Sequence, residues 1–446
     1  MMTRIRLFLV VGGYIGTLLW AYATIVSPAF DYLGCKLAWR DPVVMAWLIA
    51  LALLPVSLLP CTLTRPSAII LWWLYLVAYI PSILMPALSL TMPTERLLPL
   101  QLSLLLCMGL LCFASPERLL AVSRIQISPA VFWSVFTVVW LGCLAFILKF
   151  GPDLIGNIAS VLSGQSEYII RSIFSDQSAQ SGPALGYVVG QVGQALGPYL
   201  MAFGIAYRRW LCVVAGIFSQ IIVFGATGYK SVMFAPLLLG LLFLVVRRWR
   251  RSFGLVLTSG LIAVTLLCAA ADLASHRVLY SSLFTRRTLA VPGLLTGFYF
   301  EHYSQAAHAG IGYHFIRTGP VPAPPYEIGL TYFRSEKIDA NANLWAEGFA
   351  DFGVPGMVGY TLLVAFLIWI YDSIAVRHDL ALATLLAAIP GFNLSNSMPT
   401  TVLLTHGGIA AALLLYLSPP RKLGGTFELA LEPEQNQLVP VAGTPV

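Results

Sequence analysis

The stretch RRWRRSFGLVLTSGLIAVTLLCAAAD, residues 247–272, places four arginines directly before a long run of mostly apolar residues. An α-helix needs about 20 such residues to cross the roughly 30 Å hydrocarbon core of a bilayer. Arginine and lysine concentrate in the short cytoplasmic loops of membrane proteins. The stretch therefore predicts a transmembrane helix that starts at the cytoplasmic face.

The composition of the whole chain agrees with this reading. Hydrophobic residues make up 58% of the 446 residues, charged residues only 10%, and the mean hydropathy is +0.82. Soluble domains average roughly 45–50% apolar and about 25% charged residues. We expect an all-α polytopic membrane protein with about twelve transmembrane helices. The apolar runs place these helices near residues 6–25, 43–63, 67–90, 98–114, 129–150, 184–206, 210–227, 231–247, 253–272, 355–375, 380–397 and 400–418.

The distribution of basic residues predicts the orientation of these helices. With the N-terminus inside, the short cytoplasmic loops hold most of the arginines, including the cluster at 247–251. Both termini are then cytoplasmic, and the first apolar run is a retained helix, since no small-residue cleavage signature follows it. Residues 1–420 form one membrane domain. The polar tail 421–446 has no apolar periodicity and is expected to be disordered.

Two segments on the external side are longer than simple turns. At about 151–183 apolar residues recur at helical spacing between polar ones, which is typical of a helix on the membrane surface, although an ordinary connecting loop fits too. A large loop of about 272–354 lies between the ninth and tenth helices and is too long for a turn.

The charged residues that could do chemistry lie on this external side. The apolar runs contain almost no ionisable residues, whereas proton-coupled carriers usually keep such groups at mid-membrane, which weakens a transporter reading. Lys230 lies in GATGYKS, residues 225–231, at the mouth between two helices. Arg286 and Arg287 lie in the large loop. Lys230 could equally be an interfacial lysine that extends to water, and the two arginines an ordinary solvated face.

A polar cluster precedes the tenth helix in IDANANLWAEGFADFGVPG, residues 338–356. If the segment is helical, Asn343, Glu347 and Asp351 lie at i, i+4 and i+8 on one stripe, with Asp339 and Asn341 before them. The simpler alternative is a capped entry into the tenth helix.

Metal-ligand spacing, nucleotide-binding loops and hydrolase elbows are absent from the sequence, so we expect no metal, no cofactor and no nucleic-acid partner. Arginine binds phosphate oxygens as a fork, and a diphosphate leaving group can be stabilised without a metal. Aromatic residues such as Tyr299 and Tyr303 suit sugar faces or the lipid interface. The external side therefore suits an anionic substrate that carries sugar rings.

These features together resemble the Wzy-type polymerases of bacterial surface polysaccharides. The resemblance rests on about twelve helices, one large external loop before the last three, GATGYKSVMFAPLL, RRTLAVPG and NANLWAEGFADFGVPGMVGY, and covers most of residues 180–400. It implies a multi-pass protein of the bacterial inner membrane with a periplasmic loop and a GT-C-like fold. It also implies a metal-independent, inverting glycosyltransferase that moves the growing glycan from undecaprenyl diphosphate onto a new lipid-linked repeat unit, in O-antigen, capsule or exopolysaccharide synthesis.

The resemblance assigns roles by position. Lys230, Arg286 and Arg287 would bind the diphosphate, and Asn341, Asn343, Glu347, Tyr299 and Tyr303 would line the sugar site. His302, Glu301 and Asp339 are rival candidates for the catalytic base, with His302 slightly favoured by the ligase-like relatives. Partners would be the lipid-linked oligosaccharide, membrane lipid and a chain-length regulator. An O-antigen ligase and a multi-pass polysaccharide or lipid transporter are the alternative functions.

Overall fold

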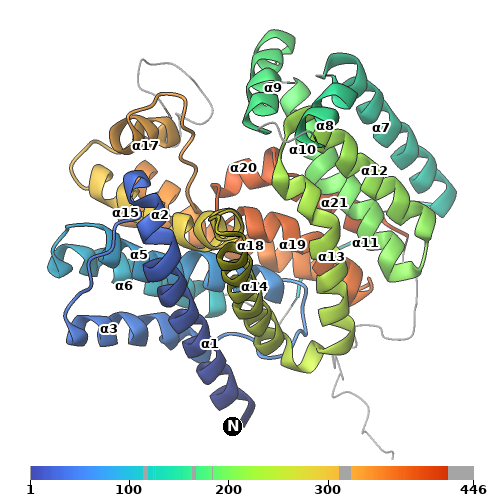
Figure 1. Cartoon of the computed structure of the whole chain (residues 1–446). Helices are drawn as coiled ribbons and strands as arrows, with labels where there is room; N and C mark the ends of the chain where they lie inside the picture. The colour runs from blue at the N-terminus through green and yellow to red at the C-terminus, as the bar shows by residue number, and fades with distance from the viewer. Residues whose placement is uncertain are drawn as a thin grey trace, which may run out of the picture.

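Figure 1 shows the computed structural model of the chain, in which every regular element of the described residues is a helix. The structure describes residues 2–113, 119–123, 125, 127–151, 153–162, 167–182, 184–310 and 323–419. Eight helices in this part are long and apolar enough to cross a membrane. The predicted tail 421–446 lies outside the described residues.

The helices run in chain order as follows. The N-terminal half contains α1 (Met2–Ala21), the π-helical η1 (Tyr22–Val26), α2 (Ser27–Phe30), η2 (Asp31–Leu33), α3 (Pro42–Leu53), η3 (Leu54–Ser57), α4 (Ala68–Trp73), η4 (Leu74–Tyr79), α5 (Ile80–Ser89), α6 (Thr94–Phe113), α7 (Pro129–Phe150), α8 (Leu154–Leu162), α9 (Glu167–Ser181), α10 (Ala184–Gln191), η5 (Val192–Leu196) and α11 (Gly197–Tyr207). The C-terminal half contains α12 (Trp210–Thr227), α13 (Lys230–Arg248), η6 (Arg250–Ser252), α14 (Phe253–Ser275), η7 (Ser282–Ala290), α15 (Val291–Tyr303), α17 (Pro324–Phe333), α18 (Leu344–Ala375), α19 (Leu380–Asn393), α20 (Pro399–Leu404) and α21 (Gly408–Leu417).

The predicted spans and the observed helices agree for most of the chain. The eight long helices are Thr3–Leu33, Ala68–Ser89, Thr94–Phe113, Pro129–Phe150, Trp210–Thr227, Lys230–Arg248, Arg250–Ser275 and Leu344–Ala375. The predicted spans 43–63 and 380–397 are shorter helices, Pro42–Ser57 and Leu380–Asn393. The predicted span 400–418 is broken into α20 and α21 by Gly407, which has a left-handed φ of +74°.

One face of the molecule gathers the segments predicted to be cytoplasmic, and we call it the N-terminal face. The Arg4 guanidinium donates to the carbonyl oxygens of Val56 and Leu59 at 2.8 and 2.6 Å. The Leu63 amide donates to the Arg250 carbonyl oxygen at 2.9 Å. Contacts between segments far apart in the chain therefore hold this face together.

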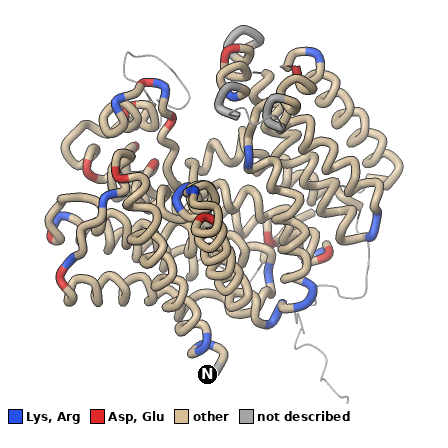
Figure 2. Tube along the Cα trace, viewed as in Figure 1, with Lys and Arg blue, Asp and Glu red and all other residues tan. Residues whose placement is uncertain are grey.

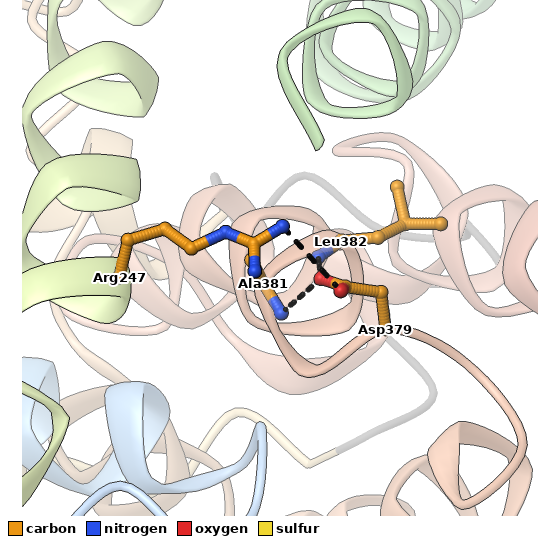
Figure 3. Close-up of polar contacts among 4 residues, drawn as sticks. All are labelled: Arg247, Asp379, Ala381 and Leu382. Carbon is orange, nitrogen blue, oxygen red and sulfur yellow. Dashed lines mark hydrogen bonds and ion pairs between the residues drawn. The ribbon is translucent and has the colours of Figure 1, made fainter. Parts of the chain in front are cut away.

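Asp379 anchors the start of α19 at the same face (Figure 3). Its carboxylate accepts from the backbone amides of Ala381 and Leu382, which lack partners inside the helix, and it lies 3.7 Å from the Arg247 guanidinium at the end of α13. In Figure 2 most of the helical body is free of charged residues, and the charges gather near helix ends and in the connecting segments.

The predicted external loop is largely a packed part of the body. The sequence expectation was a loop of about 272–354, but α15 is almost entirely buried and packs against α5 and α18. Gly293 makes this approach possible, because a Cβ there would lie 2.2 Å from the Pro81 carbonyl oxygen. The prediction of a loop is therefore correct only for the described segments between the helices of residues 272–354.

A buried polar cluster joins these three helices. The Asn343 side-chain amide donates to Thr296 Oγ1 at 2.7 Å and to Ser82 Oγ at 3.3 Å, and the two hydroxyls lie 2.9 Å apart. Asn343 Oδ1 also accepts from the amides of Trp345 and Ala346 as the N-cap of α18. The predicted capped entry is thus confirmed.

The long helix α18 contains a break. Phe352 and Gly353 are non-helical, and Gly353 has φ +65°, a conformation that glycine adopts without a Cβ penalty. The first part, 344–351, is completely buried, whereas the part from 354 onwards continues to the N-terminal face.

The predicted surface segment of about 151–183 forms the two helices α8 and α9. The Asn157 side chain is buried and donates to the Gly225 carbonyl oxygen at 2.9 Å, and α8 packs against α12. Helical spacing was therefore predicted correctly here, and the segment covers the end of a long helix.

Candidate functional site

His302 and Glu327 form an imidazole–carboxylate pair on the face opposite the N-terminal face. His302 lies in the last turn of α15, and Glu327 lies in the first turn of α17, which begins with two prolines. His302 Nε2 is 2.9 Å from Glu327 Oε1, and the Tyr303 hydroxyl donates to Glu327 Oε2 at 2.8 Å. Both carboxylate oxygens are thereby held in place.

The pair orients the imidazole ring. An ionised carboxylate only accepts hydrogen bonds, so Nε2–H of His302 points to Glu327, and Nδ1 is the nitrogen left for another partner. The His302 side chain is 17% exposed, so the ring is reachable from solvent. Burial, followed by the bond to Glu327, raises the pKa of Tyr303, so this tyrosine stays a donor. The arrangement suits a general base with an orienting carboxylate.

Glu301 points to a different partner. The Tyr332 hydroxyl of α17 donates to Glu301 Oε2 at 2.9 Å, and the Tyr332 ring stacks on Phe298 at 4.2 Å between centroids. Burial and the Glu301 contact raise the pKa of Tyr332. Glu301 therefore helps to fasten α17 onto α15.

Asp339 belongs to the segment before α18 and lies close to Arg287 of η7. Its carboxylate accepts from the Asn341 side-chain amide at 2.6 Å. Desolvation raises the pKa of Asp339, and the Asn341 hydrogen bond and the Arg287 charge oppose this shift. The Asp339 side chain is exposed. Its carboxylate therefore faces solvent, although neighbouring protein groups partly desolvate it.

A second basic group, Arg171, lies against the turn before α13 in the other half of the molecule. The Arg171 guanidinium of α9 lies 5.6 Å from the centre of the Tyr229 ring, directly before Lys230 and the start of α13. Burial raises the pKa of Tyr229; the Arg171 charge opposes this shift, and Asp339 and Tyr326 add to it. The turn around Lys230 is therefore close to the segment that carries Asp339.

Arg286 is oriented away from this group. Its guanidinium lies 4.5 Å from the centre of the Phe30 ring, and its Nε donates to Ser282 Oγ at 3.3 Å. Both arginines belong to the nine-residue π-helical η7. Arg286 contacts Phe30 and Ser282, whereas the charge of the exposed Arg287 acts on Asp339.

The residues predicted to bind sugar are mostly buried. Asn343, Tyr299, Tyr303 and Glu347 are 0%, 0%, 2% and 2% exposed, and the Tyr299 hydroxyl donates to Glu347 Oε1 at 3.1 Å. Asn341 alone is partly exposed. Burial, followed by the Glu347 charge, raises the pKa of Tyr299. These buried groups support the site from beneath.

Asp351 belongs to the same supporting layer. It is 1% exposed, and its Oδ2 accepts from the Tyr360 hydroxyl at 2.5 Å. Asp351 lies one helical turn after Glu347 in the first part of α18, as the predicted polar stripe requires.

Three contributors were missed by sequence reasoning. Glu327 lies in the proline-rich passage TGPVPAPPYEIG, where consecutive prolines followed by an acid mark a helix start. Tyr229 is part of GATGYKS, and Arg171 lies in the amphipathic segment. No group of three or more His, Cys, Asp and Glu in the described residues is arranged to hold a metal ion.

The fold and this site define an all-helical membrane protein with a charged and aromatic site at one end of its helices. The chain matches no protein-family model, and no curated protein or solved structure is significantly similar to it.

Proposed function

We propose that the protein is a membrane glycosyltransferase that polymerises lipid-linked oligosaccharide repeat units at the periplasmic face of the bacterial inner membrane. The N-terminal face would then be cytoplasmic, and the site around His302 and Arg287 would face the periplasm. The resemblance to Wzy-type polymerases suggests the reaction. The observation that carries the proposal is the His302–Glu327 pair at 2.9 Å, on the same face as the cationic residues.

The reaction needs a base, an electrostatic contact for the leaving group and no redox step. His302 Nδ1 accepts the proton of the acceptor sugar hydroxyl, whose oxygen forms a bond to the anomeric carbon of the donor glycan. The bond from that carbon to the diphosphate oxygen breaks, and undecaprenyl diphosphate leaves with the bonding electrons. Glu327 holds the imidazole and stabilises its protonated form.

Arg287 and Lys230 are the groups for the diphosphate. A guanidinium offers a planar fork to phosphate oxygens, whereas lysine supplies a point charge. Asp339 lies close to Arg287 and would hold its guanidinium until the diphosphate binds. Metal-free stabilisation of developing negative charge by such fixed cations is a general catalytic device.

Chain-length analysis in cells tests the proposal. A strain without the gene should accumulate single repeat units, and complementation with the wild type should restore long chains. Arg287→Ala should complement poorly at normal protein levels. Arg334→Ala, which removes an exposed arginine at the end of α17, is the matched control and should complement fully.

The deletion strain also separates the alternatives. Core oligosaccharide that carries one repeat unit indicates a missing polymerase. Uncapped core with polymer still on its lipid carrier indicates a missing ligase and would refute the polymerase assignment. Normal long chains in the deletion strain would refute both.

A further inference from the structure

A groove on the outside of the molecule lies between the end of the first long helix and the end of α14. Its volume is about 380 Å³, within the roughly 300–1,000 Å³ range of small-ligand sites. It is lined by Thr24, Ile25, Pro28, Ala29, Asp272, Leu273, His276, Arg277 and Val278.

Two features position the wall formed by the first helix. α1 packs along α14, and the groove begins where the helix changes to the π-helical η1. The Tyr22 hydroxyl donates to the Lys36 carbonyl oxygen at 2.8 Å and lies 2.6 Å from Ser89 Oγ on α5. These bonds tie the end of the first helix to α5.

The groove wall is apolar where the helices face lipid. Leu273 is 68% exposed, and Leu266, two turns earlier on the same face of α14, is 46% exposed. Trp20 on α1 is 43% exposed, as is common for tryptophan near a membrane interface. A hydrocarbon chain can therefore lie against α1 and α14 without leaving the membrane.

The end of the groove is cationic. α14 ends at Ser275. The next residue, His276, has a left-handed φ of +49°, and Arg277 follows it; both side chains are exposed. Arg277 forms no side-chain hydrogen bond or ion pair with the residues that the structure describes. A guanidinium at the boundary between an apolar groove and water suits a phosphate headgroup.

The one carboxylate in the groove is already compensated. Asp272 Oδ1 accepts from the amides of Leu279 and Tyr280, each at 2.8 Å, and Oδ2 accepts from the amide of Ser281 at 2.7 Å. These amides are the first of the helix that leads into η7, so the positive end of that helix faces the carboxylate. Backbone amides therefore occupy both carboxylate oxygens of the buried Asp272, and Arg277 is the exposed charged side chain of the groove.

The groove also adjoins the site described above. Phe30, whose ring lies 4.5 Å from the Arg286 guanidinium, directly follows the groove residue Ala29. Arg286 and Arg287 are neighbours in η7. A headgroup in the groove is thus next to the surface that leads to the arginines of the site.

We propose that this groove is the docking site for a polyprenyl diphosphate lipid, with the isoprenoid chain along the α1–α14 wall and the diphosphate at Arg277. This inference rests on the proposed function, because it names how the lipid carrier reaches the site. Arg286, oriented towards α2, is then a cation on the route from the groove to Arg287.

Binding of farnesyl diphosphate to the purified full-length protein tests the groove, with farnesol and inorganic diphosphate as probes of the chain and the charge alone. Arg277→Gln should weaken farnesyl diphosphate binding by about ten-fold or more and leave farnesol binding unchanged, since one charge-assisted contact is lost. Ala29→Trp fills the groove and should weaken both. Arg96→Gln removes an exposed arginine near the start of α6 and serves as the matched control, with no effect expected.

Unchanged affinity for farnesyl diphosphate in Arg277→Gln overturns the assignment, as does an equal loss in Arg96→Gln. Displacement of the probe by equimolar phosphatidylglycerol would show an ordinary phospholipid site and also overturns it. If long chains form in cells but Arg277→Gln binds normally, the groove assignment alone fails. If the probe binds in the groove as expected and the cells make no polymer, the proposed function alone fails.

Discussion

Replacing Glu327 by glutamine tests the histidine–carboxylate pair most directly. The side chain keeps its size, but the negative charge that accepts from His302 at 2.9 Å and from Tyr303 at 2.8 Å is lost. Hydrogen bonds to charged groups contribute about 1.5–3 kcal/mol and neutral ones about 0.5–1.5 kcal/mol, so each bond weakens by about 1 kcal/mol. We expect the free energy of unfolding to fall by about 1–2 kcal/mol, which a folded protein tolerates.

The effect on the reaction should be much larger than the effect on folding. When the glutamine oxygen keeps the bond from Tyr303, the glutamine NH2 faces His302 Nε2 and donates to it, so the ring hydrogen moves to Nδ1 and the basic lone pair is no longer available to the acceptor hydroxyl. General-base assistance contributes about 10²–10⁴-fold, and we expect a loss of polymerisation rate in that range. The assay is chain formation by purified protein from lipid-linked repeat units, with thermal unfolding measured on the same samples.

Two matched variants make this prediction decisive. Glu336→Gln makes the same change at an exposed residue just after α17 and should leave the rate unaltered. Glu301→Gln, on the same helix as His302, weakens only the hydrogen bond from Tyr332 and should reduce the rate by less than ten-fold. A normal rate in Glu327→Gln, or a larger loss in Glu301→Gln than in Glu327→Gln, would refute the assignment of His302 as the base.

Three further predictions follow from contacts elsewhere in the molecule. Arg286→Ala should lower the free energy of unfolding by about 1 kcal/mol through the lost contact with the Phe30 ring, whereas Arg287→Ala, at an exposed residue, should cost less than about 1 kcal/mol and abolish long chains. Asn343→Leu should destabilise the protein by about 2–4 kcal/mol in chemical denaturation, because it removes a helix cap and leaves buried hydroxyls with one partner fewer; a loss below 1 kcal/mol would contradict the buried cluster. Asp379→Asn should cost less than 0.5 kcal/mol and Asp379→Ala about 1 kcal/mol, since asparagine also caps a helix and the Arg247 pair is half exposed; equal losses in the two variants would show that the ion pair dominates.

The helical class could be predicted from the sequence because a membrane span leaves a local signal. Long apolar runs such as 129–150 and 210–227 end at the same residues in the prediction and in the structure. The C-terminal end of α19 could not be predicted from the sequence. The predicted span continues to residue 397, whereas α19 ends at Asn393, three residues after Pro390. The carbonyl oxygen of Leu394, the next residue, accepts from the Leu344 amide.

The burial of α15 could not be predicted for a different reason. Val291–Tyr303 has only 13 residues, fewer than the roughly 20 needed for a span, so it was read as part of a loop. Its depth is set by partners far away in the sequence, such as Pro81 beside Gly293 and Asn343 beside Thr296. The same long-range packing brings Glu327 to His302, a contact between residues 25 positions apart that no local pattern contains.

The length of α19 places the start of α18 below the membrane surface if the N-terminal face is cytoplasmic and α19 runs along the membrane normal. The helix starts at Asp379 on that face and has 14 residues, which at 1.5 Å per residue span about 21 Å of the roughly 30 Å hydrocarbon core. Since Leu344 bonds to Leu394 at the end of α19, the start of α18 lies at this depth as well. At this depth, backbone outside helices is tolerated only where protein buries it or water reaches it. Asn393 and Gln194, whose side chains form a hydrogen bond to each other, are both partly exposed. Water should therefore reach this level from the opposite face and solvate the polar groups there that protein does not cover.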